Sequence, residues 1–155
     1  ESLTVEDFDQ AIGINLRGTW LCCQAEIAQM AKQQTGGVIV NTSSWLAHGA
    51  LEGSTLYSIS KAGLDNMVRA LALETSRQGI RINNVNPGVI DTDMYRQNTD
   101  EASRKPFIAH TPMSRVGSPD EVAEAVVWLS SDASRFVTGQ NLLVDGGYTI
   151  PGNRV

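Results

Sequence analysis

Apolar residues recur at helical spacing, three or four positions apart, in three stretches of the chain. The first stretch covers residues 5–33 and ends before two glycines, and the second covers residues 55–77 and ends before Gly79. The third follows the sequence SPDE at 118–121, in which the serine caps the helix, the proline fits its first position and the glutamate completes a capping box. We expect a helix in each stretch, with a kink or break near Asn15, where glycines interrupt the first.

Short runs of β-branched and other apolar residues alternate with these helical stretches. They occupy residues 38–40, 80–85 and 142–144, and the pattern predicts a buried strand at each. Residues 91–117 are polar and irregular, so we expect a long loop with short helical pieces, which is typical of a functional segment. Alternation of helices and strands favours an α/β fold, in which helices cover a parallel sheet and the crossovers are right-handed.

Composition excludes several classes of protein. The chain has 155 residues, of which 41% are hydrophobic and 19% charged, as expected for one globular domain and not for a disordered chain. Its net charge of −5 disfavours nucleic-acid binding, and no apolar run approaches the ~20 residues of a membrane span. The acidic first residues do not resemble a signal peptide, and the adjacent Cys22 and Cys23 indicate reduced thiols in a cytoplasmic protein. Neither cysteine has the spacing of a metal site.

Tyr57 and Lys61 are the first candidates for chemistry, because residues four apart share one face of a helix. An ammonium beside a phenol favours the phenolate, and such a pair can exchange a proton with an alcohol or carbonyl. The same spacing also suits a surface lysine beside a partly buried tyrosine. Ser43 and Ser44 follow the strand at 38–40, at the end where open α/β sheets bind ligands. Ser44 and Tyr57 are therefore expected to face one cleft, although both serines could instead cap or turn the chain.

Five segments together resemble the successive motifs of the short-chain dehydrogenase/reductases. These are VNTSS (40–44), YSISK (57–61), NNVNPGVIDT (83–92), RVGSPDEVA (115–123) and TGQNLLVDGG (138–147). Their order and spacing match the second half of that family over nearly the whole chain. The resemblance implies the C-terminal part of a Rossmann-like, doubly wound parallel sheet with helices on both faces, with residues 1–155 forming a single partial domain.

The resemblance also implies a catalytic set. Tyr57 would be the acid/base, Lys61 would support the phenolate and hydrogen-bond the nicotinamide ribose, and Ser44 would orient and polarise the substrate oxygen. Asn15, in INLRG, would hold a water in a proton relay to Lys61, and its alternative role is that of a helix-breaking polar residue. The implied reaction is hydride transfer between a nicotinamide and a secondary alcohol or ketone.

The cofactor would be NAD or NADP, with its nicotinamide end held by the turn that contains Pro87, Gly88, Ile90 and Thr92. Substrate selectivity is expected in residues 45–56 and 93–112. Candidate lining residues, which could equally be core residues under a loop, are Trp45, Leu46, Met94, Tyr95, Phe107 and Ile108. His48 and His110 lie in the same segments and would contact either substrate or solvent.

The first half of the family pattern is missing. The chain has no Gly-x-x-x-Gly-x-Gly turn, no Asn-Asn-Ala-Gly stretch and no charged residue at the end of a second strand, which are the parts that hold the pyrophosphate and ribose. We expect these residues to be a portion of a longer protein, or another segment to complete the sheet, and the isolated chain to be poorly stable and inactive. The family resemblance implies a homotetramer.

Two other functions stay open from the sequence. One is a truncated, non-catalytic assembly protein whose helices at 15–33 and 55–77 pack against other subunits. The other is reduction of a carbon–carbon double bond on the same frame, although the Ser44–Tyr57 spacing favours carbonyl chemistry.

Overall fold

The computed structural model describes residues 3–151, and its centre is a parallel sheet. The strands β1 (Gly37–Thr42), β2 (Ile80–Pro87) and β3 (Asn141–Val144) lie side by side in that order. Ile39 lies opposite Ile82, and Asn84 lies opposite Asn141. The predicted α/β class and parallel pairing are confirmed, and β1 and β2 continue beyond the apolar runs that predicted them.

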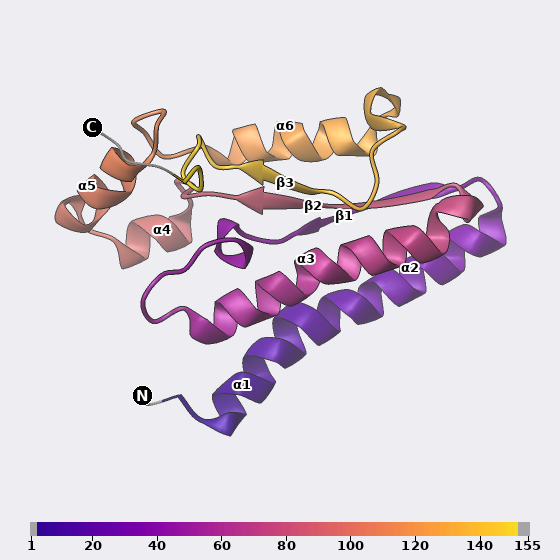
Figure 1. The fold of residues 1–155 in the computed structure, drawn as a ribbon, viewed down its shortest axis with the longest axis horizontal. Coiled ribbons are helices and arrows are strands. Elements are labelled where there is room, and N and C mark those ends of the chain that lie inside the picture. The colour runs from indigo at the N-terminus through magenta and orange to yellow at the C-terminus, as the bar shows by residue number, and fades with distance from the viewer. Residues whose placement is uncertain (1–2, 152–155) are drawn as a thin grey trace.

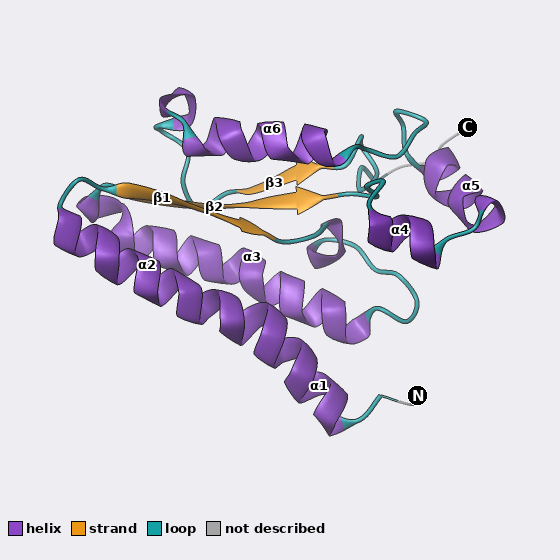
Figure 2. Cartoon of the chain, turned by 180° about the vertical axis from the view of Figure 1, so that it is seen from behind, coloured by secondary structure: helices purple, strands orange, loops and turns teal. Residues whose placement is uncertain are grey.

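Helices cover both faces of the sheet (Figures 1 and 2). The helices α1 (Val5–Ile12), α2 (Thr19–Gln33) and α3 (Thr55–Thr75) lie on one face, and α6 (Pro119–Ser130) lies on the other. The predicted long loop contains α4 (Asp93–Asn98) and α5 (Glu101–His110), which lie beyond the carboxyl ends of the strands (Figure 2). The two-sided coverage is that of a doubly wound sheet.

Helix ends follow the predicted signals with one exception. Capping boxes join Thr4 to Asp7 at the start of α1 and Ser118 to Glu121 at the start of α6. Helix α2 ends at Gln33, as predicted, but the left-handed residue that follows it is Gln34, with φ of 56°, and not a glycine. The expected break near Asn15 is a π-helical turn, Gly13–Gly18, which joins α1 to α2.

The main core fills the space between the sheet and helices α2 and α3. Cys23, Ile39, Val68, Ile80 and Ile82 form one buried apolar cluster, and each is at most 5% exposed. Both cysteines are free, and the neighbouring Cys22 is exposed. None of the helices in residues 3–151 is long and apolar enough to cross a membrane.

A candidate active site at the carboxyl ends of the strands

A pocket of about 610 Å³ opens where β1 and β2 end, between the loop after β1, the start of α3 and helix α4. It brings together most of the residues that the sequence analysis assigned to the site, but Asn15, Lys61, Ile108 and the two histidines do not line it. The predicted residues that line it are Ser44, Trp45, Leu46, Tyr57, Pro87, Gly88, Ile90, Thr92, Met94 and Tyr95. Phe107 of α5 also lines it, so this aromatic residue belongs to the pocket wall.

Tyr57 and Lys61 lie on the first turns of α3, and Lys61 lies behind the phenol. The Lys61 Nζ is 5.5 Å from the centre of the Tyr57 ring and donates a hydrogen bond of 2.8 Å to the Thr42 carbonyl oxygen. An ammonium has three donors, so two remain for a ligand. Burial lowers the pKa of Lys61, and the charge of Asp65 acts against that shift. Tyr57 is 40% exposed, so its side chain is accessible to a bound molecule.

Ser44 both caps a turn and lines the pocket. Its Oγ accepts a hydrogen bond of 3.2 Å from the Leu46 N–H, at the start of the 3₁₀ turn Trp45–Ala47. A hydroxyl that accepts one bond keeps its own proton to donate, so capping does not exclude contact with a substrate oxygen. Ser43 also lines the pocket, and its Oγ donates to the Lys61 carbonyl oxygen at 3.3 Å, so its proton is already used within the fold.

Asn15 reaches helix α3 through Ser60. The Asn15 Nδ2 donates to the Ser60 Oγ at 3.1 Å, and that hydroxyl donates to the Tyr57 carbonyl oxygen at 2.7 Å. The π-helical turn is thus tied to α3 between the two catalytic candidates. The water relay from Asn15 to Lys61 stays a prediction.

The turn after β2 offers groups that suit a planar amide. Gly88 N–H and Asp91 N–H donate to the carbonyl oxygens of Val144 and Gly117, whereas the Ile90 N–H has no acceptor among residues 3–151. The Thr92 Oγ accepts a hydrogen bond from the Tyr95 N–H at 3.2 Å and keeps its own proton. A free N–H and a hydroxyl donor beside the pocket fit the carboxamide of a nicotinamide.

A polar cluster around the buried Asp65 was missed by the sequence analysis. The Asp65 carboxylate of α3 is 4% exposed and lies 2.9 Å from the His48 Nε2. His48, for which substrate or solvent was the expected contact, is therefore paired with an acid. The available signal was Asp65 itself, because a charged residue between the buried Leu64 and Val68 of one helix needs a partner. His110 lies edge-on to the Tyr148 ring, with 4.6 Å between ring centres.

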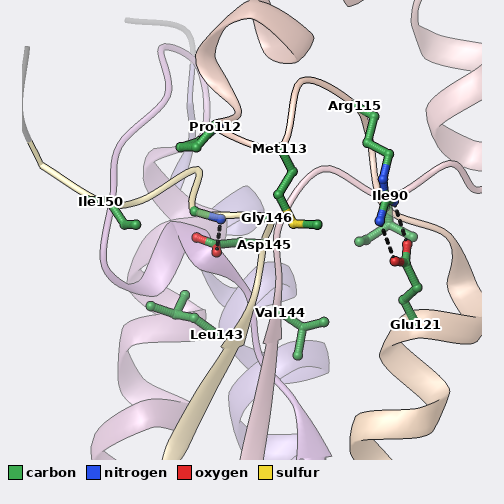
Figure 3. A pocket seen from close by; sticks show the side chains of 12 residues that line it. Ile90, Pro112, Met113, Arg115, Glu121, Leu143, Val144, Asp145, Gly146 and Ile150 are labelled. Carbon is green, nitrogen blue, oxygen red and sulfur yellow. Dashed lines mark hydrogen bonds and ion pairs between the residues drawn. The ribbon is translucent and has the colours of Figure 1, made fainter. Parts of the chain in front are cut away.

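Figure 3 shows a second pocket, of about 530 Å³, between the end of β3 and the segment before α6. Its charged side chains are already paired. Arg115 binds both carboxylate oxygens of Glu121, at 2.8 and 2.6 Å, and Asp145 accepts hydrogen bonds from Gly147 and Thr149. The Arg115 guanidinium, helped by the Ser118 N–H, lowers the pKa of Glu121 to about 2. The charged side chains at this pocket therefore bind one another or the backbone.

Comparison with known proteins gives consistent matches over nearly the whole chain. A family model described as enoyl-(acyl carrier protein) reductase matches residues 1–149. A D-threitol dehydrogenase from Mycolicibacterium smegmatis is 37% identical over 150 residues, which are 97% of this chain and 57% of that protein. The chain thus spans little more than half the length of this relative.

Solved structures agree with the sequence matches. A putative gluconate dehydrogenase from Agrobacterium tumefaciens superposes with a TM-score of 0.92 and 31% identity, covering 97% of this chain and 60% of that one. A short-chain type dehydrogenase/reductase from Mycobacterium marinum gives a TM-score of 0.88 and 30% identity, covering 97% and 59%. The sheet, the helices and the pocket described above therefore lie in a fold whose solved examples include oxidoreductases.

Proposed function

Because the chain belongs to the short-chain dehydrogenase/reductase family, we propose that it forms the catalytic half of an NAD- or NADP-dependent oxidoreductase. The proposed reaction interconverts a secondary alcohol and a ketone. The observation that carries the proposal is the convergence of Ser44 and Tyr57 on one pocket, with Lys61 directly behind the phenol.

The nicotinamide, when bound, supplies or accepts the hydride. The residues that would hold its carboxamide are the turn residues Pro87, Gly88, Ile90 and Thr92, and the free Ile90 N–H supports that role. Lys61 has donors to spare for the ribose hydroxyls. The pyrophosphate and adenine would need residues outside the pattern of this chain.

The residues of this chain would carry out the proton transfer to and from the substrate hydroxyl. In oxidation the Tyr57 phenolate takes this proton, and in reduction the Tyr57 phenol returns it to the carbonyl oxygen. The Lys61 ammonium favours the phenolate, and the free proton of Ser44 donates to the same substrate oxygen. Asn15 would hold the water of a relay to Lys61, and its bond to Ser60 fixes it beside α3.

Apolar residues exposed on the outer helices support the proposal of a homo-oligomer, with a tetramer as the assembly that the family resemblance implies. Val5, Ile14 and Leu21 are 71%, 66% and 52% exposed along α1, the π-helical turn and α2. Side chains of this kind are stabilised when a second copy covers them. A cytoplasmic location is part of the same proposal.

Replacement of Tyr57 by phenylalanine tests the enzyme against the non-catalytic assembly protein. The protein expressed from its natural gene is assayed with NADH and NADPH against a panel of ketones and one 2-enoyl thioester. We expect ketone reduction, and a loss of about 10²–10⁴-fold in kcat for Tyr57→Phe, because general acid–base catalysis contributes that much. Glu74→Gln, at an exposed position of the same helix, is the control and should retain turnover.

Three outcomes would contradict the proposal. Full turnover in Tyr57→Phe would remove the phenol from the mechanism. Reduction of the enoyl substrate alone would move the chemistry to a carbon–carbon double bond. Absence of turnover in the wild type, with assembly unaffected in the variant, would favour the assembly protein.

A further inference from the structure

One buried carboxylate, that of Asp65, joins three segments that border the proposed active site. Its Oδ2 lies 2.9 Å from His48 Nε2 in the loop after β1 and accepts a hydrogen bond of 2.8 Å from Asn86 Nδ2 at the end of β2. Its Oδ1 accepts further bonds from Asn86 at 3.1 Å and from Asn84 at 3.2 Å. Asp65 itself lies on α3, one turn after Lys61. No step of the proposed reaction uses it.

We propose that Asp65 is a positioning residue for this active site, in which its carboxylate holds the Ser44 turn and the end of β2 against the helix of Tyr57. The proposal rests on the proposed dehydrogenase function. We refer to the side chains of Asp65, His48 and Asn86 as the Asp65 clamp.

The contacts show why the clamp acts on Ser44. The turn that begins at Ser44 ends at His48, and both ends are held. The Ser44 carbonyl oxygen accepts a bond of 3.1 Å from Asn86 Nδ2, and the His48 ring lies against Asp65. Asn86 also directly precedes Pro87, the first residue of the turn proposed for the nicotinamide. Hydrogen bonds to a carboxylate are roughly twice as strong as neutral ones, so one charge fixes the spacing of both turns.

The charge of Asp65 has a second, separable effect on Lys61. It favours the ammonium form and opposes the effect of burial. The groups that face Asp65 from other elements are His48 from the loop and the neutral amides of Asn84 and Asn86 from β2, while Asn141 of β3 donates to its backbone carbonyl. His48 is thus the one titratable side chain among these partners. Removing the carboxylate charge should change proton transfer, whereas removing His48 should change geometry alone.

Three variants of the protein expressed from its natural gene separate these effects. Asp65→Asn keeps the volume but removes the charge that raises the pKa of Lys61. We expect kcat to fall about tenfold and the alkaline limb of the kcat/KM profile, where Lys61 loses its proton, to move to lower pH. His48→Ala should lower kcat/KM about tenfold without moving that limb. His48→Gln should recover part of the loss, because its amide N–H can donate to Asp65. Glu74→Gln, which removes an exposed carboxylate from the same helix, is the control and should leave both readouts unchanged.

Several results would overturn the clamp. An unchanged pH profile and kcat in a folded Asp65→Asn protein would do so, as would equal turnover in His48→Ala and wild type. If Asp65→Asn does not fold, the His48 pair decides, because a purely structural role predicts no rescue by glutamine.

A spectroscopic measurement separates failure of the clamp from failure of the enzyme proposal. The ring ¹⁵N resonances of His48 should change in Asp65→Asn whether or not any substrate is turned over. A wild type without hydride transfer contradicts the proposed function alone. An active wild type whose His48 resonances are indifferent to Asp65 contradicts the clamp alone.

Discussion

Replacing Gly88 by alanine tests how closely the ends of β2 and β3 pack against each other beneath the candidate site. Gly88 follows β2, and its N–H donates a bond of 3.0 Å to the Val144 carbonyl oxygen at the end of β3. A Cβ at this position would lie 2.6 Å from both Cα and Cβ of Asp145. Gly88 does not have a positive φ, so alanine adds no backbone strain of the left-handed kind. Any loss of stability must therefore come from the collision.

The magnitude follows from the distances. Carbon atoms approach comfortably at about 3.5 Å, so the ends of the two strands must part by roughly 0.9 Å. Asp145 cannot yield easily, because its carboxylate is bonded to Gly147 and Thr149 at 2.9 Å each. The Gly88–Val144 bond would then stretch to nearly 4 Å and be lost, at about 0.5–1.5 kcal/mol. Overpacking adds about 1–3 kcal/mol, and the stiffer unfolded chain returns about 0.4–1 kcal/mol. We expect a net loss of about 0.5–4 kcal/mol.

Urea unfolding followed by circular dichroism measures this loss. Gly13→Ala is the matched control, because its nearest neighbour, Arg17 Nη2, is 3.7 Å away and alanine favours a helix over glycine. We expect the control to be neutral or stabilised. A loss below about 0.5 kcal/mol for Gly88→Ala would refute the reasoning, because it would show that the ends of β2 and β3 separate freely. The turn proposed to hold the nicotinamide would then lack a rigid base.

Three further predictions concern stability, pH and turnover. Leu64→Ala, at a side chain 1% exposed, should cost about 2–5 kcal/mol of unfolding free energy in the same urea assay, and a smaller loss would indicate a loosely packed α3. The pKa of Glu121 is about 2, below its ordinary value of 4.5, so its stabilising effect is present above pH 4.5 and lost as the pH falls toward 2. The urea midpoint of Glu121→Gln should therefore vary less with pH over this range than that of the wild type, and parallel curves would contradict the role of the Arg115 pair. Ser60→Ala removes the link between Asn15 and α3 and should lower kcat about tenfold, whereas unchanged turnover would separate Asn15 from the proposed relay.

Local patterns predicted most of the fold, because helix periodicity and caps depend on residues close in sequence. The extent of the strands was predicted less well. β1 continues beyond its predicted run through Asn41 and Thr42, and β2 continues through Asn86 and Pro87, so polar residues extend both strands. The buried side-chain N–H groups of Asn84 and Asn86 are satisfied because they donate to Asp65. That compensation requires the tertiary structure.

In the candidate site, too, some features could be predicted from local patterns and others required the tertiary structure. Ser44, Tyr57 and the Pro87 turn were predicted to meet, because strand ends and the following helix share one edge of a parallel sheet. The pairing of His48 with Asp65 was not predicted, since it joins an irregular loop to a helix and neither segment has a period that relates the two residues. The glycines near Asn15 predicted an interruption of the first helix, but they did not predict that the interruption is a π-helical turn.

The register of the sheet also determines the order in which its strands can pair during synthesis of the chain. Gly37 pairs with Ile80 and Asn84 with Asn141, so the partners lie roughly 40 and 60 residues apart and no hairpin can form first. A ribosome that adds 5–20 residues per second delivers β3 about 3–12 s after β2. During that interval the backbone of β2 on the side that later pairs with β3, which includes Asn84 and Asn86, has no partner strand, because Asn141 has not yet been synthesised. Slow translation between residues 88 and 141 would lengthen the period in which this strand edge is exposed to pairing with other chains.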